Sequence, residues 1–357
     1  APLVTGARRL LSAFEKLIPE KARTAAVYEP SAVLAVLEEF AADPAGVGSP
    51  VCLFSGDTGF FSGAAAVLTA LEEQGWECRE IPGISSVQAF SARIGRPWQD
   101  WQLLSAHGTD RDIGALLSRG ERLFLLTGGS ITLSSLAAYL ASHGGEEACL
   151  TVGSRLGAPD ERIWRGRAAD YSPAYADESL SCVLVERSLP RPPLPKGALP
   201  DSFFTRREQI PMTKRFVRAA VLSLLPLADE TLVWDIGCGS GAVTVELARS
   251  AFCHVYAVDV KEEACSLTAQ NCRRASLVNV DIVQGAAPPA LAGLPAPDAV
   301  FVGGSGGKLV EIPYTYNENV KKIDDRMMEK LALPDFRRAR LKKVLQMRDV
   351  VKIMQVH

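Results

Sequence analysis

The residues best suited to chemistry lie in one short stretch, Val233 to Ala242, which reads VWDIGCGSGA. An apolar run ends in Asp235, glycines follow at 237, 239 and 241, and apolar positions then recur at helical spacing as far as Arg249. This pattern predicts a strand, a tight turn and a helix. Backbone N–H groups and the positive end of the helix can approach a ligand closely at such a turn, and both dinucleotides and S-adenosylmethionine are bound in this way.

The spacing of the acidic residues favours one of these two ligands. The next predicted strand, His254–Val260, carries Asp259 near its end, where a carboxylate can accept hydrogen bonds from both ribose hydroxyls, but NAD sites share this feature. The turn itself follows the pattern Asp-x-Gly-x-Gly-x-Gly and not Gly-x-Gly-x-x-Gly. It therefore favours S-adenosylmethionine.

Two further strands are predicted downstream of this turn. Residues 280–289 fit a strand whose end would border the adenine, and residues 297–307 fit a strand that opens onto the reaction centre. The ends of such strands gather at the carboxyl edge of a parallel sheet. For Gly306 and Gly307, a role in close helix–strand packing is an equally good interpretation.

The whole chain has an ordinary globular composition. Its 357 residues are 47% hydrophobic and 22% charged, which is enough material for two or three packed domains. No apolar run reaches membrane-spanning length and the first residues lack the sections of a signal peptide, so a soluble, cytoplasmic protein is expected, with no membrane partner.

The positions of the cysteines, histidines and charged residues argue against several other classes of protein. Eight cysteines are scattered without a C-x-x-C pair and the four histidines do not cluster with them, so neither a metal site nor a disulfide framework is indicated. The net charge is −2, and the basic excess is confined to the region from Lys308 onward, which contains 12 Lys and Arg and 7 Asp and Glu. The body of the protein has no nucleic-acid footprint, so no nucleic-acid partner is expected.

A proline-rich segment divides the chain into two parts. The run SLPRPPLPKGALPDS ends at residue 202, and proline at this density favours an extended, semi-rigid segment. We expect a linker at residues 189–202, with one domain before it and another after it.

Four blocks of the second half resemble a known family. They are IPMTKRFVRAAVLSLL, WDIGCGSGAVTVELAR, QGAAPPAL and FVGGSGGKLVEI, and in this order they are similar to the CbiT-type methyltransferases of cobalamin biosynthesis. The resemblance implies a Rossmann-like class I S-adenosylmethionine methyltransferase domain at residues 203–312. It also implies that the cofactor is contacted by Thr213, Gly237, Cys238, Gly239, Ser240, Gly241, Asp259 and Ala287. Two positions depart from the family, since Phe216 and Ala286 stand where acidic residues are usual.

The first half contains a different glycine-rich turn, at residues 51–63. Alone it is more typical of a structural turn than of a ligand site, because Gly and Asp suit tight turns. Together with residues 80–98, 103–112, 122–129 and 157–166, however, it resembles the CbiE-type tetrapyrrole methylases. This resemblance implies two α/β subdomains, residues 1–100 and 101–188, with S-adenosylmethionine between them. The cofactor residues implied are Ser55, Gly56, Asp57, Phe60, Ser85, Ser86 and Thr127.

The start of the chain departs from that family. Such domains open with a strand and a Gly-x-Gly-Pro-Gly turn, whereas APLVTGARRLL is similar to the segment that follows the turn. The chain is therefore expected to lack a strand at the centre of the first sheet, and both domains are expected to be incomplete.

The two resemblances in one chain are the arrangement of the fused precorrin-6Y methyltransferases. That family implies methylation of a precorrin at carbons 5 and 15, with decarboxylation of the carbon-12 acetate. A substrate with many carboxylates needs cationic donors, for which the candidates are Arg206, Arg207, Lys214, Arg215 and Arg218, although a solvated basic helix face explains them equally well.

No general acid or nucleophile is indicated, because methyl transfer mainly requires alignment, and a homo-oligomer is compatible with the sequence. Two other interpretations stay open at this point: a single-site methyltransferase acting on protein or RNA, and a truncated chain that serves only as a scaffold.

Residues 313–357 are unlike the family. Val320, Ile323, Met327 and Leu331 recur at helical spacing, as do Leu341, Val344 and Leu345, and Pro334 separates the two runs. Two amphipathic basic helices and at most one added strand, at residues 350–356, are predicted. A partner-binding extension and a segment without a role are both compatible with this pattern.

Overall fold

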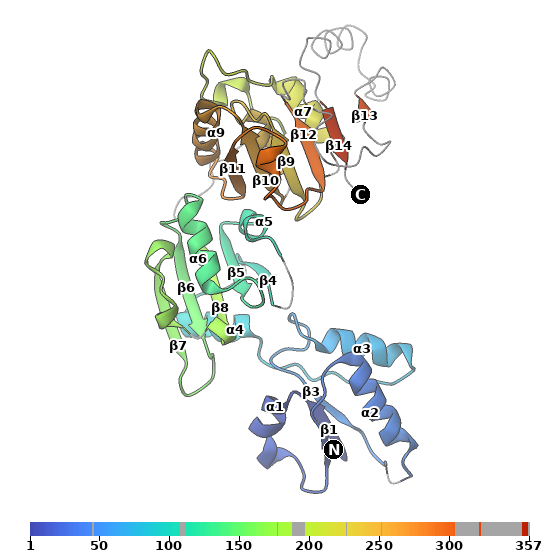
Figure 1. Cartoon of the computed structure of the whole chain (residues 1–357). Coiled ribbons are helices and arrows are strands. Elements are labelled where there is room, and N and C mark those ends of the chain that lie inside the picture. Colours follow the sequence, from blue (N-terminus) through green and yellow to red (C-terminus); the bar gives the residue numbers. More distant parts are fainter. Residues whose placement is uncertain are drawn as a thin grey trace. The chain divides into compact units, whose positions relative to one another are not determined.

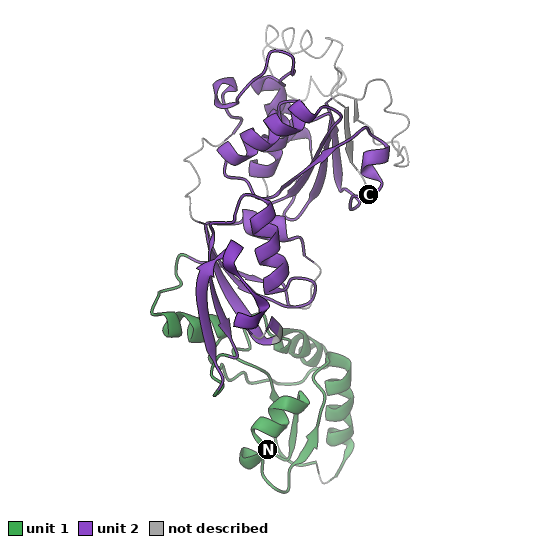
Figure 2. Cartoon of the chain, turned by 60° about the vertical axis from the view of Figure 1, so that its left-hand side comes forward, with its two compact units in different colours: residues 1–100, 156–159 green, residues 101–155, 160–357 purple. Residues whose placement is uncertain are grey.

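The structure is a computed structural model of the whole chain (Figure 1). It describes residues 1–303 apart from 45, 108–110, 177, 188–196, 226 and 251, and beyond these the backbone of 321–322 and 352–355. The chain forms two compact units, residues 1–100 with 156–159 and residues 101–155 with 160–357 (Figure 2). The second unit contains both the predicted second subdomain and the methyltransferase half. The predicted linker lies mostly outside the described residues and stays a prediction.

The first unit is built on a three-stranded parallel sheet of order β2-β1-β3. Its strands are β1 (Leu3–Gly6), β2 (Arg23–Ala25) and β3 (Val51–Leu53), and its helices are α1 (Arg8–Ala13), η1 (Glu15–Leu17), α2 (Pro30–Ala42), α3 (Ala64–Glu73) and α4 (Ser86–Ile94). The expectation that this sheet lacks a strand stays a prediction. Among the described strands, the central position belongs to β1. The buried side chains of Leu3 and Val4 hold it there, with Leu3 against Val33 and Leu37 of α2. Whether a further strand precedes it stays a prediction.

The second unit begins with a five-stranded mixed sheet of order β4-β5-β8-β6-β7. Its strands are β4 (Gln102–Ser105), β5 (Arg122–Leu126), β6 (Cys149–Ser154), β7 (Arg162–Arg167) and β8 (Ser181–Glu186). Its helices are α5 (Ile113–Ser118), α6 (Leu133–Ser142), η2 (Ala168–Asp170), η3 (Pro173–Tyr175) and η4 (Glu178–Leu180). The run Cys182 to Val185 is buried without interruption, as expected of a strand inside a sheet with both faces covered.

The same unit continues with a second sheet, in which β11, β10, β9 and β12 lie side by side and parallel. These strands are β9 (Leu232–Ile236), β10 (His254–Asp259), β11 (Val280–Gln284) and β12 (Ala299–Val302). The helices are η5 (Asp201–Phe203), α7 (Arg215–Leu224), α8 (Ala242–Ser250), α9 (Glu262–Arg274) and η6 (Pro289–Leu291). All four strands coincide with strands predicted from the sequence, so the predicted α/β class is confirmed for both halves.

Two strands from the last residues extend this sheet. β14 (Lys352–Gln355) pairs antiparallel with β12, and β13 (Lys321–Lys322) pairs antiparallel with β14. The predicted strand at 350–356 is confirmed. The limit of one added strand is wrong, because the exposed edge of β14 offers free backbone donors and acceptors that β13 pairs with. The two predicted helices otherwise lie outside the described residues.

Candidate active site

The glycine turn between β9 and α8 is the centre of the candidate site. Gly237, Gly239 and Gly241 have φ angles of 77°, 57° and 71°, in the left-handed region that favours glycine. A Cβ at Gly241 would lie 2.7 Å from the Thr268 side chain on α9, so this glycine permits helix packing. A Cβ at Gly239 would lie 3.1 Å from the carbonyl oxygen of Pro211. The chain therefore passes close to its neighbours at the turn where the sequence predicts the ligand.

Asp259 fastens the turn to the end of β10. Its Oδ2 accepts a hydrogen bond of 3.0 Å from the Gly239 N–H, and its Oδ1 accepts one of 3.0 Å from the Lys261 N–H. The side chain is half-buried. Each carboxylate oxygen retains a lone pair, so Asp259 can still accept hydrogen bonds from a ribose.

A second carboxylate, Asp235, is fully buried under the turn. Its Oδ2 accepts a hydrogen bond from the Thr244 hydroxyl, while its Oδ1 has no hydrogen-bond partner among the described residues. Burial raises the pKa of Asp235 to about 7, and the nearby charge of Asp259 adds to this effect. The sequence pattern included Asp235 only as part of the turn. Its position two residues before the first glycine was the signal that it belongs to the site.

The remaining predicted cofactor residues of this half lie around the same turn. Cys238 and Ser240 are buried in it, with the Cys238 sulfur 3.4 Å from the Thr268 hydroxyl and the Ser240 carbonyl accepting from Asn271 at 2.8 Å. Thr213 follows Pro211 by two residues, and Ala287 packs on the cluster formed by Ile236 and Val258.

The end of β12 closes the site on the other side. A Cβ at Gly303 would lie 2.9 Å from the Gly237 carbonyl oxygen, so the ends of β9 and β12 nearly touch. In open α/β sheets, ligands bind outside the carboxyl ends of the strands at the point where the strand order reverses. That point here lies between β9 and β12. Gly306 and Gly307 lie outside the described residues.

Four of the five predicted substrate donors are exposed around the start of α7: Arg206, Arg207, Lys214 and Arg215. Lys214 caps the helix, and Arg215 donates from Nε to the Ala198 carbonyl at 2.8 Å. Phe216, in the same turn, is 78% exposed. This segment therefore offers cationic groups and an aromatic ring to solvent near the glycine turn.

The prediction that the fifth candidate, Arg218, contacts the substrate is wrong. Its side chain is 0% exposed and all three guanidinium nitrogens donate to protein acceptors. Nε lies 3.3 Å from Glu246, Nη1 lies 2.8 Å from Asp201, and the ring of Phe204 stacks 4.6 Å from the guanidinium carbon. No guanidinium nitrogen is accessible to a substrate carboxylate, so Arg218 anchors α7 to the domain.

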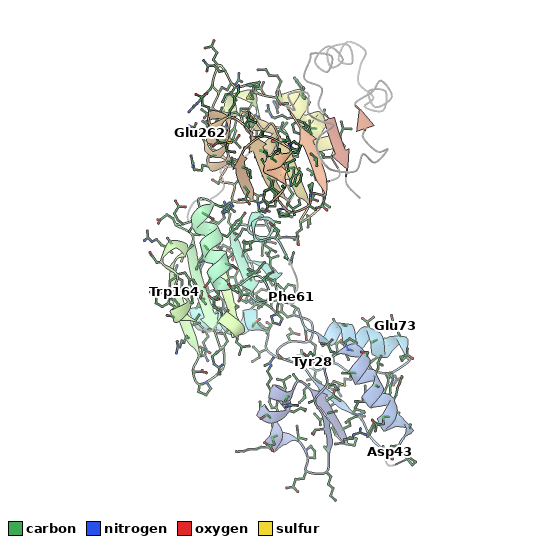
Figure 3. All side chains as sticks on the ribbon, viewed as in Figure 1. Tyr28, Asp43, Phe61, Glu73, Trp164 and Glu262 are labelled. Carbon is green, nitrogen blue, oxygen red and sulfur yellow. The ribbon has the colours of Figure 1, made fainter. Side chains whose placement is uncertain are left out.

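The first unit holds six of the predicted cofactor residues. Gly56 adopts φ 69°, and a Cβ at Gly83 would overlap the Gly56 carbonyl, so the segments 55–60 and 83–86 lie against each other. Asp57 Oδ1 accepts from the Gly59 N–H at 2.9 Å. Phe60 packs edge to face on Phe61, which is labelled in Figure 3.

The serines of this unit are engaged in local contacts. Ser55 accepts a hydrogen bond from Arg9, and Ser85 forms a capping box with Gln88 at the start of α4, directly before Ser86. These contacts order the turn, and a binding role for the serines stays a prediction.

Thr127, the predicted cofactor residue of the second subdomain, lies at the end of β5 in the second unit. It is buried, and its hydroxyl donates to the Ser181 carbonyl at 3.1 Å and lies 2.8 Å from the Ser181 hydroxyl. Its role toward a cofactor stays a prediction.

Neither a metal-binding cluster nor a membrane-spanning helix is found among the residues that the structure describes. No group of three or more His, Cys, Asp or Glu residues there could hold a metal ion. None of the helices in that part of the chain is long and apolar enough to cross a membrane.

The sheet order, the glycine turn after β9 and the acid at the end of β10 define an α/β methyltransferase-type domain. Comparison with known proteins is more specific. Residues 1–171 match the family model of tetrapyrrole (corrin/porphyrin) methylases, and residues 203–319 match that of the precorrin methyltransferase domain. The second match extends past residue 312, where the resemblance was expected to end.

Two curated relatives cover different shares of the chain. The precorrin-6Y C(5,15)-methyltransferase [decarboxylating] of a Sinorhizobium species is 34% identical over 73% of this chain and 63% of its own length. The probable cobalt-precorrin-6B C(15)-methyltransferase (decarboxylating) of Pyrobaculum calidifontis is 40% identical over 37% of this chain and 68% of its own length.

Among solved structures, a precorrin-6Y C5,15-methyltransferase from Geobacter metallireducens is 35% identical, with a TM-score of 0.32, over 34% of this chain and 64% of its own. The chain belongs to the precorrin methyltransferase family. It spans just under two thirds of the length of the Sinorhizobium relative.

Proposed function

We propose that the protein transfers methyl groups from S-adenosylmethionine to a precorrin, at carbons 5 and 15, with loss of the carboxyl of the carbon-12 acetate. The observation that carries this proposal is the glycine turn after β9. Its Gly239 N–H donates a hydrogen bond to Asp259, and the buried carboxylate of Asp235 lies beneath it. The name of the Sinorhizobium relative supports both methyl transfers, and the name of the Pyrobaculum relative supports the carbon-15 transfer with decarboxylation.

The residues of the second half fit S-adenosylmethionine. The cofactor carries a cationic ammonium and a cationic sulfonium, and the unpartnered Oδ1 of Asp235 is an acceptor that such a cation would satisfy. Asp259 would hold the ribose, and Gly237 to Gly241 would let the backbone approach. Ala287 and Thr213 would complete the lining of the S-adenosylmethionine site.

The bound cofactor supplies a methyl group on sulfur that leaves by in-line displacement. The chain's part in this reaction is to align donor and acceptor carbon. The backbone of the turn fixes the donor, and exposed Arg206, Arg207, Lys214 and Arg215 would hold substrate carboxylates. The conjugated macrocycle can accept the electrons released when carbon dioxide leaves, so no residue needs to provide a covalent site.

A second cofactor site is proposed in the first half, from Ser55, Gly56, Asp57, Phe60, Ser85, Ser86 and Thr127. The turn at 55–60 and the capped start of α4 support it, because they place backbone groups and a helix N-terminus together within the first unit. The two sites would then serve separate methyl transfers.

Titration calorimetry with S-adenosylmethionine tests this proposal. The native chain should bind two molecules and Gly239→Val should bind one, because the new side chain meets the Pro211 carbonyl in a strained backbone conformation. The matched control is Gly293→Val, at a glycine with no atom within 4 Å of an added Cβ. It should bind two. A native chain that binds no S-adenosylmethionine, or a Gly239→Val variant with unchanged binding, would contradict the proposed site at the glycine turn after β9.

A further inference from the structure

A histidine that the proposed reaction does not use lies between two carboxylates. His254, at the start of β10, is 2% exposed. Its Nδ1 is 2.7 Å from both oxygens of Asp112, and its Nε2 is 2.8 Å from Oδ2 of Asp281 on β11. Ionised carboxylates only accept hydrogen bonds, so the ring must donate from both nitrogens. Only the protonated imidazolium can do this.

A second histidine repeats the arrangement. Nε2 of His143, at the end of α6, lies 2.8 Å from Oδ1 of Asp281, and its Nδ1 lies 2.9 Å from the Tyr139 carbonyl. Nδ1 also lies 2.9 Å from the Ser142 hydroxyl, so Asp281 requires a proton on Nε2, whereas Nδ1 can donate to the carbonyl or accept from the hydroxyl. With both rings protonated, two positive charges balance the two carboxylates, and we call Asp112, His143, His254 and Asp281 the ionic joint.

The ionic joint connects two segments that are distant in sequence. Asp112 caps α5 and His143 ends α6, both in residues 101–188, whereas His254 and Asp281 belong to the sheet of the methyltransferase half. The Tyr139 hydroxyl donates to the Val278 carbonyl at 2.8 Å across the same contact. A Cβ on Gly114 of α5 would lie 3.0 Å from His254 Nδ1, so a glycine is needed for this approach.

The titratable groups that face His254 come from every element packed on it. They are Asp112 from the start of α5, Tyr139 and His143 from α6, Tyr256 from β10 and Asp281 from β11. The carboxylates are the only groups among these that carry negative charge at neutral pH. The proton on His254 is therefore what allows Asp112 and Asp281 to lie on opposite sides of one ring.

We propose that the protons on His254 and His143 help to join residues 101–188 to the methyltransferase half, and that loss of the His254 proton at alkaline pH weakens this contact, which Arg111 and Arg119 also hold through Glu230. The proposal does not depend on the reaction proposed above. It assigns the ionic joint a role in holding residues 101–188 against the methyltransferase half.

The direction of the pH effect follows from the contacts. Burial alone lowers the pKa of His254, but its hydrogen bonds to Asp112 and Asp281 raise the pKa from 6.5 to about 9. Burial likewise opposes the ionisation of Asp281, yet the same histidines hold its pKa well below the usual range. Because the folded pKa of His254 is raised, its stabilisation is complete below about 6.5 and is lost as the pH rises through 9.

The first test is an NMR titration of the four histidines in the full chain, labelled with ¹³C at histidine. One histidine should titrate with a midpoint near 9. Asp112→Asn should move this midpoint down toward 6.5, while asparagine still caps α5. The control Asp170→Asn, at an exposed aspartate paired with Arg167, should leave it unchanged. A native midpoint at or below 6.5, or one that Asp112→Asn does not move, would overturn the proposal.

The second test measures this weakening. Amide exchange, corrected for its intrinsic pH dependence, is compared in α5 and α6 and in α2 of the first unit. Above neutral pH, exchange in α5 and α6 should accelerate by up to about tenfold per pH unit until the pH passes 9, while α2 is unaffected. Equal acceleration in all three helices, or none in α5 and α6, would contradict weakening of the contact.

Discussion

Replacing Arg218 with methionine should destabilise the methyltransferase half strongly. Methionine keeps an apolar stem in the space that the arginine occupies, but Glu246 loses its partner at 3.3 Å while both residues are 0% exposed. Breaking a buried ion pair on one side costs about 3–5 kcal/mol. Arg249 still lies 2.9 Å from the other oxygen of Glu246, so we expect the lower end, about 3 kcal/mol.

Hydrogen exchange in the full chain is the suitable assay, because a chain with two compact units has no single unfolding midpoint. A loss of about 3 kcal/mol corresponds to roughly 150-fold faster exchange of the slowest amides of β9, β10 and β12. The exposed Arg206→Met control should change this free energy by less than about 0.5 kcal/mol. The reasoning fails if Arg218→Met exchanges like the native chain, and a folded variant that loses only precorrin binding would restore Arg218 as a substrate residue.

Three further predictions concern the cofactor sites and the last residues. Affinity for S-adenosylmethionine at the site in the methyltransferase half should rise as the pH passes about 7, because the ionised Asp235 attracts a cation, and Asp235→Asn should flatten the calorimetric profile. Without cofactor the sign is opposite: because the pKa of Asp235 is raised from 3.8 to about 7, the methyltransferase half should lose stability as the pH rises across this range, which amide exchange of β9 would detect. Asp57→Ala should abolish one methyl transfer only, and loss of both in a folded variant, seen by product mass, would contradict independent sites. Deleting residues 313–357 removes β14 and should speed amide exchange in β12, whereas unchanged exchange would show that the pairing is dispensable.

The sheet of the methyltransferase half could be predicted because each of its parallel strands is a short run of mostly apolar residues. Val233 to Ile236 and Val255 to Val258 are continuous enough to identify without partners, and the turn chemistry between strand and helix is local. Asp259 follows from the same logic, since a residue at the end of a parallel strand lies at the ligand edge.

Residues whose roles depend on distant partners could not be predicted. Arg218 belongs to a basic segment that looks solvent-facing, yet its partners Glu246 and Asp201 lie 28 and 17 residues away. Asp112 and His254 are 142 residues apart, and no local pattern in the sequence links them. β13 was missed because pairing with the edge of β14 overrides the helical spacing of its surroundings.

The most direct measurement of the central claim is mass spectrometry of a precorrin-6Y substrate after incubation with the full chain and S-adenosylmethionine labelled in its methyl group. The account predicts a product that carries two labelled methyl groups and has lost one carboxyl as carbon dioxide, and with Gly239→Val a product that carries one labelled methyl group. A native chain that binds S-adenosylmethionine and transfers no label to the macrocycle would contradict it.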